Sequence, residues 1–182
     1  MNLKNIWASI LNNRAKNGSD KILKSLQIKQ GDVIADIGSG GGYYSFLFSE
    51  LIEPEGKVYA IDTDKALLEC LDKKVKKQRI SNIATLDGGS ICNLPKKSCD
   101  LIFLRNVFHH ISNPTLYFQN LRESMKPEGR MAIIEWSPSG MMRNKHCTDE
   151  MEIIEVLQDV GYKQVESYEF LKGQSFNIFE LK

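Results

Sequence analysis

Short apolar runs and amphipathic segments alternate along most of the chain. Runs that suit buried strands occupy residues 33–37, 57–62, 83–86, 100–104 and 130–136. Between and after them, apolar residues recur every three or four positions, which predicts helices over residues 44–51, 64–77, 114–125 and 149–160. Thr148 is expected to cap the last of these helices. A closing antiparallel hairpin is expected from residues 163–171 and 174–181. Strands that alternate with helices in this way are typical of an open, mostly parallel α/β sheet.

The N-terminal part of the chain precedes this alternation. Residues 1–18 are expected to form a short helical segment, and Ser19 is expected to cap a second helix that ends near Leu26. A length of 182 residues suits one domain with a substantial core. A single domain over residues 1–182 is therefore predicted.

Four glycines within five positions follow the first expected strand, between Gly38 and Gly42. Glycine permits a sharp backbone turn and lets a ligand approach without a Cβ in the way. In open parallel sheets, ligands bind outside the carboxyl ends of the strands, where the strand order reverses. The sequence therefore predicts a cofactor site at this turn.

Composition and charge exclude several other functions. The formal net charge is +1, which predicts no strong attraction to nucleic acid or to an anionic membrane. No apolar run approaches the roughly 20 residues that span a bilayer, and no secretory signal pattern is present at the start. The four cysteines are scattered, which indicates a cytoplasmic protein with reduced thiols.

Asp36 stands two positions before Gly38 and helps to decide between two kinds of cofactor site. Dinucleotide sites use the pattern G-x-G-x-x-G, but here the third glycine would be Tyr43 or Ser45. A carboxylate beside the turn would also repel a pyrophosphate, which binds backbone N–H groups and a helix dipole. A cofactor that carries positive charge suits Asp36 better.

The stretch Asp36–Gly42 has the form D-x-G-x-G-x-G and resembles the first motif of class I S-adenosylmethionine-dependent methyltransferases. Further segments are similar to that family's later motifs and follow in the same order: Val58–Asp62, Leu94–Ile102, Asn106–His110 and Leu121–Arg130. The resemblance is strongest toward the small-molecule, type 11-like branch that includes quinone methyltransferases. It implies a Rossmann-like, mostly parallel seven-stranded sheet with helices on both faces and a C-terminal antiparallel hairpin.

The same resemblance implies S-adenosylmethionine as the methyl donor and S-adenosylhomocysteine as the product. Asp62 would accept hydrogen bonds from the ribose hydroxyls. The family usually has an aspartate where Ser90 stands, so adenine recognition is expected to rest partly on backbone groups and to be weaker than usual. The residues implied to bind the cofactor are Asp36, Gly38, Ser39, Gly40, Gly42, Tyr43, Asp62, Thr63, Ser90, Ile91 and Asn106.

Methyl transfer from a sulfonium depends more on alignment than on any catalytic group, and a base is needed only if the acceptor must lose a proton. The candidates near the transferred methyl group are Asn106, His109 and Glu135, which follow or end the fourth and fifth strands. The pair His109 and His110 invites a metal assignment. No further ligands fall at a usable spacing in the sequence, so no metal is expected.

Three hypotheses remain at this point. The first is a methyltransferase for a small-molecule acceptor, the second a non-catalytic cofactor-binding or scaffold subunit, and the third a nicotinamide-dependent dehydrogenase. Because residues 137–147 form only a short loop, three alternatives stay open: the acceptor pocket is open, a homo-oligomer or a partner subunit completes it, or it suits a bulky substrate. Neither a nucleic acid nor a membrane is expected as a partner.

Overall fold

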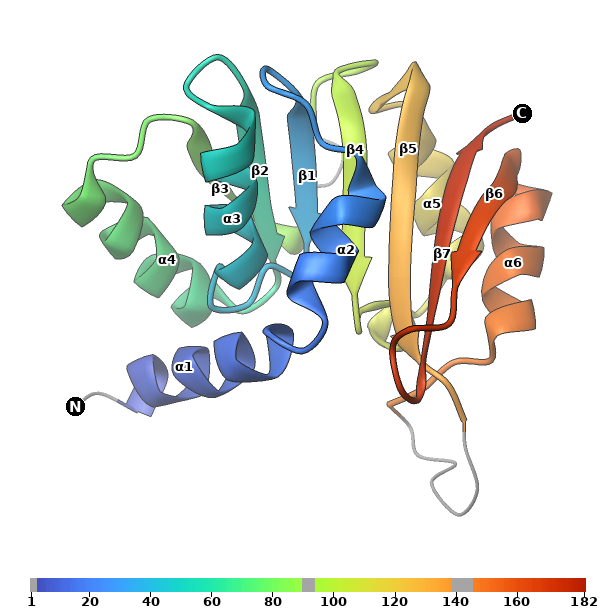
Figure 1. Ribbon diagram of the computed structural model, residues 1–182, viewed down its shortest axis with the longest axis horizontal. Coiled ribbons are helices and arrows are strands. Elements are labelled where there is room, and N and C mark those ends of the chain that lie inside the picture. Colours follow the sequence, from blue (N-terminus) through green and yellow to red (C-terminus); the bar gives the residue numbers. More distant parts are fainter. Residues whose placement is uncertain (1–2, 90–93, 139–145) are drawn as a thin grey trace. The chain divides into compact units, whose positions relative to one another are not determined.

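A computed structural model describes residues 3–89, 94–138 and 146–182 (Figure 1). The chain divides into two compact units, residues 1–91 and residues 92–182.

The first unit is built on three parallel strands in the order β3-β2-β1. The strands are β1 (Val33–Ile37), β2 (Lys57–Asp62) and β3 (Ile83–Asp87), and the helices are α1 (Leu3–Ala15), α2 (Ser19–Leu26), α3 (Tyr43–Ile52) and α4 (Lys65–Gln78). The register places Ile37 opposite Ile61, so the ends of β1 and β2 lie at the same edge. The predicted glycine turn and the acid at the end of β2 therefore share that edge.

Helix α4 shows how local chemistry fixes these elements. Its N-cap is Asp64, whose carboxylate accepts hydrogen bonds from the backbone N–H groups of Ala66 (2.8 Å) and Leu67 (3.3 Å). Its buried face consists of Leu67, Leu68, Leu71 and Val75, the stripe expected from the sequence.

The second unit contains four strands in the order β4-β5-β7-β6. Its elements are β4 (Cys99–Arg105), the 3₁₀ turn η2 (Phe108–His110), α5 (Pro114–Arg122), β5 (Met125–Trp136), α6 (Glu150–Asp159), β6 (Tyr162–Tyr168) and β7 (Gln174–Leu181). Strands β4 and β5 are parallel, whereas β7 is antiparallel to both β5 and β6. The expected closing hairpin is therefore confirmed.

Two boundaries in this unit correct the sequence prediction. Helix α5 ends at Arg122 and not at residue 125, because Met125 already pairs with Cys99 as the start of β5. A register shift between Cys99 and Leu101 accommodates the following Lys-Pro-Glu-Gly segment within the strand.

The cap of α6 is also one residue later than expected. Asp149, and not Thr148, accepts a hydrogen bond from the backbone N–H of Met151, at 2.9 Å. Thr148 is buried, and its backbone N–H donates a hydrogen bond to the carbonyl oxygen of Trp136. Its place beside the end of β5 keeps it outside the helix.

Two expectations from composition can be compared with the described residues. None of the helices described combines the length and the apolarity that crossing a membrane requires. Among the cysteines that the structure describes, Cys70, Cys99 and Cys147, no disulfide is formed.

Candidate functional site

The glycine turn is held against the end of β2 by backbone hydrogen bonds. The N–H groups of Gly38 and Ser39 both donate to the carbonyl oxygen of Ile61, at 2.8 and 2.9 Å. Gly38, Gly40 and Gly42 adopt positive φ angles of 72°, 54° and 84°. Because L side chains rarely adopt this conformation, the turn requires glycine at these positions.

The carboxylate of Asp62 is part of the same turn. Its Oδ2 accepts a hydrogen bond from the N–H of Gly40 at 2.7 Å, and its Oδ1 accepts one from the N–H of Asp64 at 2.9 Å. A carboxylate has about four lone-pair directions, so Asp62 keeps capacity to accept from a ligand. Thr63 follows it, exposed to solvent, and packs against Gly88, where a Cβ would lie 2.7 Å from its methyl group.

Asp36 lies beneath the turn, inside the first unit. Its side chain is 3% exposed and accepts a hydrogen bond from the hydroxyl of Ser45, at 2.5 Å. Burial raises the pKa of the Asp36 carboxyl to about 7, while the Ser45 hydrogen bond partly offsets the effect. A nearby positive charge would favour the ionised form, so Asp36 suits a cationic ligand more than an anionic one.

Ser39, in the middle of the turn, carries a buried polar atom without a partner. The residue is 8% exposed, and its Oγ makes no hydrogen bond within the part of the chain that the structure describes. Buried hydroxyls are almost always paired, and an exception marks a place where a ligand or water supplies the partner. The turn therefore fits a bound polar molecule.

Helix α1 packs on this turn, which the sequence did not indicate. A Cβ on Gly41 would lie 2.5 Å from the carbonyl oxygen of Ala8 and 2.4 Å from Oδ1 of Asn12. The Asn12 amide donates to the carbonyl oxygen of Gly41 at 3.2 Å. In the sequence, Asn12 is one polar residue of a weakly amphipathic helix, so nothing distinguishes it from a solvent-exposed position.

The two tyrosines after the turn fasten the N-terminal helices. The hydroxyl of Tyr43 donates to Ser19 and that of Tyr44 to the carbonyl oxygen of Ala15, both at 3.2 Å. Tyr44 is buried and Tyr43 is half-buried. The expected contact of Tyr43 with the cofactor stays a prediction.

The adenine side of the expected site is only partly placed. Ser90 and Ile91 lie outside the described residues. Asp87, which ends β3, accepts a hydrogen bond from the N–H of Gly89 (3.1 Å) and pairs with Lys65 (3.4 Å). These two contacts lower the pKa of the Asp87 carboxyl and tie the residue to its own loop.

In the second unit, Asn106 follows β4 directly and adopts a left-handed backbone conformation, with φ of 57°. Its N–H donates to the carbonyl oxygen of Ile134, and its side-chain oxygen accepts from Gln174 at 2.6 Å. Asparagine tolerates this conformation better than most residues, and such positions cluster at functional sites. The contact with Gln174 comes from β7, far away in sequence.

His109 and Glu135, which were separate candidates in the sequence, form a buried pair. Nδ1 of His109 lies 3.0 Å from Oε1 of Glu135, and their side chains are 6% and 0% exposed. The Glu135 carboxylate also accepts from the backbone N–H groups of His109 (3.3 Å) and Trp136 (2.7 Å). Because a carboxylate only accepts, Nδ1 carries the proton, and in the neutral imidazole the lone pair of His109 lies on Nε2.

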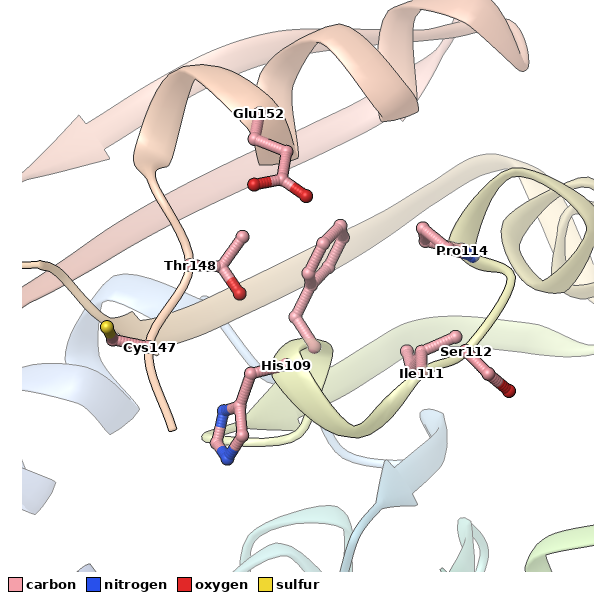
Figure 2. Close-up of a pocket in the computed structure, with 8 residues that line it drawn as sticks. His109, Ile111, Ser112, Pro114, Cys147, Thr148 and Glu152 are labelled. Atoms are coloured by element: carbon pink, nitrogen blue, oxygen red, sulfur yellow. The ribbon is translucent and has the colours of Figure 1, made fainter. Parts of the chain in front are cut away.

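A cleft of about 320 Å³ lies beside His109 (Figure 2). Thr148 and Glu152 lie on one side of it, and Ile111, Ser112 and Pro114 lie on the other. Its size suits a small molecule.

His146 joins His109 and His110 in space, with one ring nitrogen from each residue within 4.8 Å of the others. The sequence argument against a metal rested on the lack of a further ligand at a usable spacing. That reason does not hold in the folded chain, because His146, which precedes α6, lies beside the 3₁₀ turn.

A family model described as a methyltransferase domain matches residues 28–176 of this chain. The solved structure of a SAM dependent methyltransferase from Aquifex aeolicus is 28% identical with a TM-score of 0.78, and the match covers 88% of this chain and 87% of that one. The family match begins before β1 and ends within β7.

Curated relatives match over a smaller share of their own length. The demethylmenaquinone methyltransferase of Lactobacillus johnsonii is 25% identical over 119 residues, which are 64% of this chain and 49% of the relative. The protein-L-isoaspartate O-methyltransferase of Methanococcoides burtonii is 29% identical over 109 residues, 59% and 51% of the two chains. The chain spans about half the length of these relatives. It belongs to the methyltransferase domain family, and both the resemblance to class I S-adenosylmethionine-dependent methyltransferases and the Rossmann-like fold expected from its sequence are confirmed.

Proposed function

We propose that this chain transfers a methyl group from S-adenosylmethionine to a small-molecule acceptor, with its two units acting as one domain. The observation that carries the proposal is the hydrogen bond from the Gly40 N–H to the Asp62 carboxylate. It joins the glycine turn and the acid that ends β2 into one site. Family membership supplies the identity of the methyl donor.

Each residue of the turn is proposed to bind a different part of the cofactor. The backbone from Gly38 to Gly42 lets the ligand approach, Asp62 accepts from its ribose, and Asp36 favours its positive charge. The unpartnered Oγ of Ser39 supplies a further hydrogen bond. Bound S-adenosylmethionine supplies an activated methyl group on sulfur, so the protein chiefly aligns the acceptor and excludes water.

His109 is the proposed general base for a methyl-accepting substrate that carries an acidic O–H or N–H group. The Glu135 carboxylate holds Nδ1–H, and the lone pair on Nε2 remains for the proton. Glu135 itself is fully buried behind the imidazole, so it is a positioning residue and not a second base. Asn106 is proposed to contact the cofactor from the end of β4.

Two observations favour a small acceptor. The cleft beside His109 has the size of a small-molecule site. One matched relative is a demethylmenaquinone methyltransferase, which makes a quinol the first acceptor to test. The second relative is a protein-L-isoaspartate O-methyltransferase, so an isoaspartyl peptide is the competing acceptor.

The first experiment separates the dehydrogenase hypothesis from the other two by ligand. Thermal unfolding is measured with S-adenosylmethionine, S-adenosylhomocysteine and NAD, and we expect the first two to raise the Tm while NAD leaves it unchanged. Asp62→Ala should abolish that rise. Asp72→Ala, a matched change on α4 at a residue paired with Lys76, should retain it. A rise with NAD alone would overturn the proposal.

The second experiment measures formation of S-adenosylhomocysteine with a demethylmenaquinol and with an isoaspartyl peptide. Turnover with the quinol supports the small-molecule assignment, and turnover with the peptide alone refutes it. Cofactor binding without turnover on a broad panel of acceptors would favour the non-catalytic subunit.

A further inference from the structure

All three histidines of this chain meet at one place in the second unit. His109 and His110 belong to η2, whereas His146 lies before α6, on a different segment. The ring centroids of His109 and His110 are 4.0 Å apart, and those of His146 lie 5.6 and 6.0 Å from them. Histidine is the commonest metal ligand in proteins, so this convergence raises the question of a bound ion.

The buried member of the group is already oriented as metal-ligating histidines are. Glu135 accepts a hydrogen bond from Nδ1–H of His109 at 3.0 Å, which fixes the tautomer and leaves Nε2 as the metal-binding atom. A carboxylate behind the imidazole is the usual second partner of a zinc-bound histidine. Glu135 is itself held by two backbone N–H groups, so the His109 ring has little freedom.

The nitrogens lie near enough for a tetrahedral ion to draw them together. In a tetrahedral site, Zn–N bonds of about 2.0–2.1 Å place the ligand nitrogens roughly 3.3 Å apart. The three imidazole nitrogens of this group lie within 4.8 Å of one another. His110 and His146 are exposed at the surface, so rotation of their rings can supply the remaining contraction. Three imidazoles leave a fourth position open.

We propose that His109, His110 and His146 bind one divalent transition metal, with Zn²⁺ as the ion that three imidazoles suit best. The site joins η2 to the segment that leads into α6. Its fourth ligand is water or an oxygen of a bound molecule, because the group recorded among the described residues contains no thiolate or carboxylate. This inference goes beyond methyl transfer and depends on neither the cofactor nor the acceptor.

The test measures Zn²⁺ binding by calorimetry on the full chain, without cofactor or acceptor. We expect one Zn²⁺ per chain. His110→Ala and His146→Ala should each weaken binding at least tenfold, and Glu135→Gln should weaken it roughly 10–100-fold through the second partner of His109. Circular dichroism checks that each variant is folded, and the two exposed histidines are the changes least able to unfold the chain.

Cys147 supplies the matched control. It follows His146 and lines the cleft beside His109, yet it is not one of the three grouped ligands. Cys147→Ser should therefore bind Zn²⁺ as tightly as the parent, and Co²⁺ in the site should show a tetrahedral absorption spectrum without a thiolate charge-transfer band. Loss of binding in Cys147→Ser, binding that survives His146→Ala, or no measurable binding would each overturn the assignment.

Discussion

Four glycines of the first unit allow the conformational and the steric demands of its turns to be measured separately. Gly31 has a positive φ of 82° and open space where a Cβ would point. Gly41 lacks a positive φ, but a Cβ there would overlap atoms of α1. Gly42 has a φ of 84°, and a Cβ there would overlap Leu71. Gly89 has neither, since its nearest neighbour would lie 3.6 Å away. Substituting each by alanine gives a two-by-two comparison.

The expected losses follow from these contacts. At Gly31 the left-handed backbone costs roughly 1–2 kcal/mol, offset by about 0.4–1 kcal/mol from the stiffer unfolded chain. At Gly42 the same strain is joined by overlap with Leu71, whose Cδ1 would lie 1.9 Å away. Leu71 is fully buried and cannot swing outward, so overpacking adds about 1–3 kcal/mol. Gly41→Ala should lose about 1–3 kcal/mol from overlap with α1 alone, and Gly89→Ala should lose nothing.

Urea unfolding followed by circular dichroism measures these free energies, and each kcal/mol shifts the Tm by roughly 2–4 °C in a chain of this size. The order of losses should be Gly42, then Gly41, then Gly31, with Gly89 last. If Gly42→Ala loses no more unfolding free energy than Gly31→Ala, the Leu71 side chain does not block a Cβ at position 42. If Gly41→Ala matches Gly89→Ala, α1 does not rest on the turn.

Three further outcomes concern Asp36 and His109. Burial raises the pKa of the folded Asp36 carboxyl to about 7, so between about pH 4 and 7 this carboxyl is ionised only in the unfolded chain. The free energy of unfolding should therefore fall by up to about 1.4 kcal/mol for each unit by which the pH rises in that range. Asp36→Asn should remove that slope, and urea titrations at pH 5 and pH 8 measure it; equal slopes in both proteins would refute the assignment. If the positive charge of S-adenosylmethionine lies near Asp36, binding at pH 6 should release a proton, and calorimetry in two buffers of different ionisation enthalpy would detect it. His109→Gln should leave cofactor affinity unchanged and lower kcat by about 10²–10⁴-fold on an acceptor that must lose a proton, whereas a kcat near that of the parent would remove His109 from the chemistry.

Most helices and strands can be predicted from local sequence patterns. The apolar runs marked strands, the three- and four-residue periodicity marked α4, and a dense group of glycines after β1 marked the turn. The start of β5 was misplaced because Pro127 and Gly129 usually end an element. Here they fall where the pairing with β4 shifts register, a feature that depends on the neighbouring strand.

Contacts between distant segments could not be predicted in this way. Asn12 reaches the glycine turn, and Gln174 reaches Asn106, only because the folded chain brings other elements beside them. Glu135 was a catalytic candidate from its place at the end of a strand. Its burial behind His109, visible only in the structure, is the reason that we propose it as a positioning residue.

The lone pair on Nε2 of His109 connects the two proposals for the second unit. A nitrogen that coordinates Zn²⁺ cannot accept a proton at the same time, so the metal-bound and proton-accepting states exclude each other. We therefore expect Zn²⁺ to inhibit methyl transfer at the concentration at which it binds, with cofactor affinity unchanged. His146→Ala should relieve that inhibition and keep the turnover of the metal-free parent. Stimulation by Zn²⁺, lost in His146→Ala, would show instead that the metal holds the acceptor and that His109 serves only as its ligand.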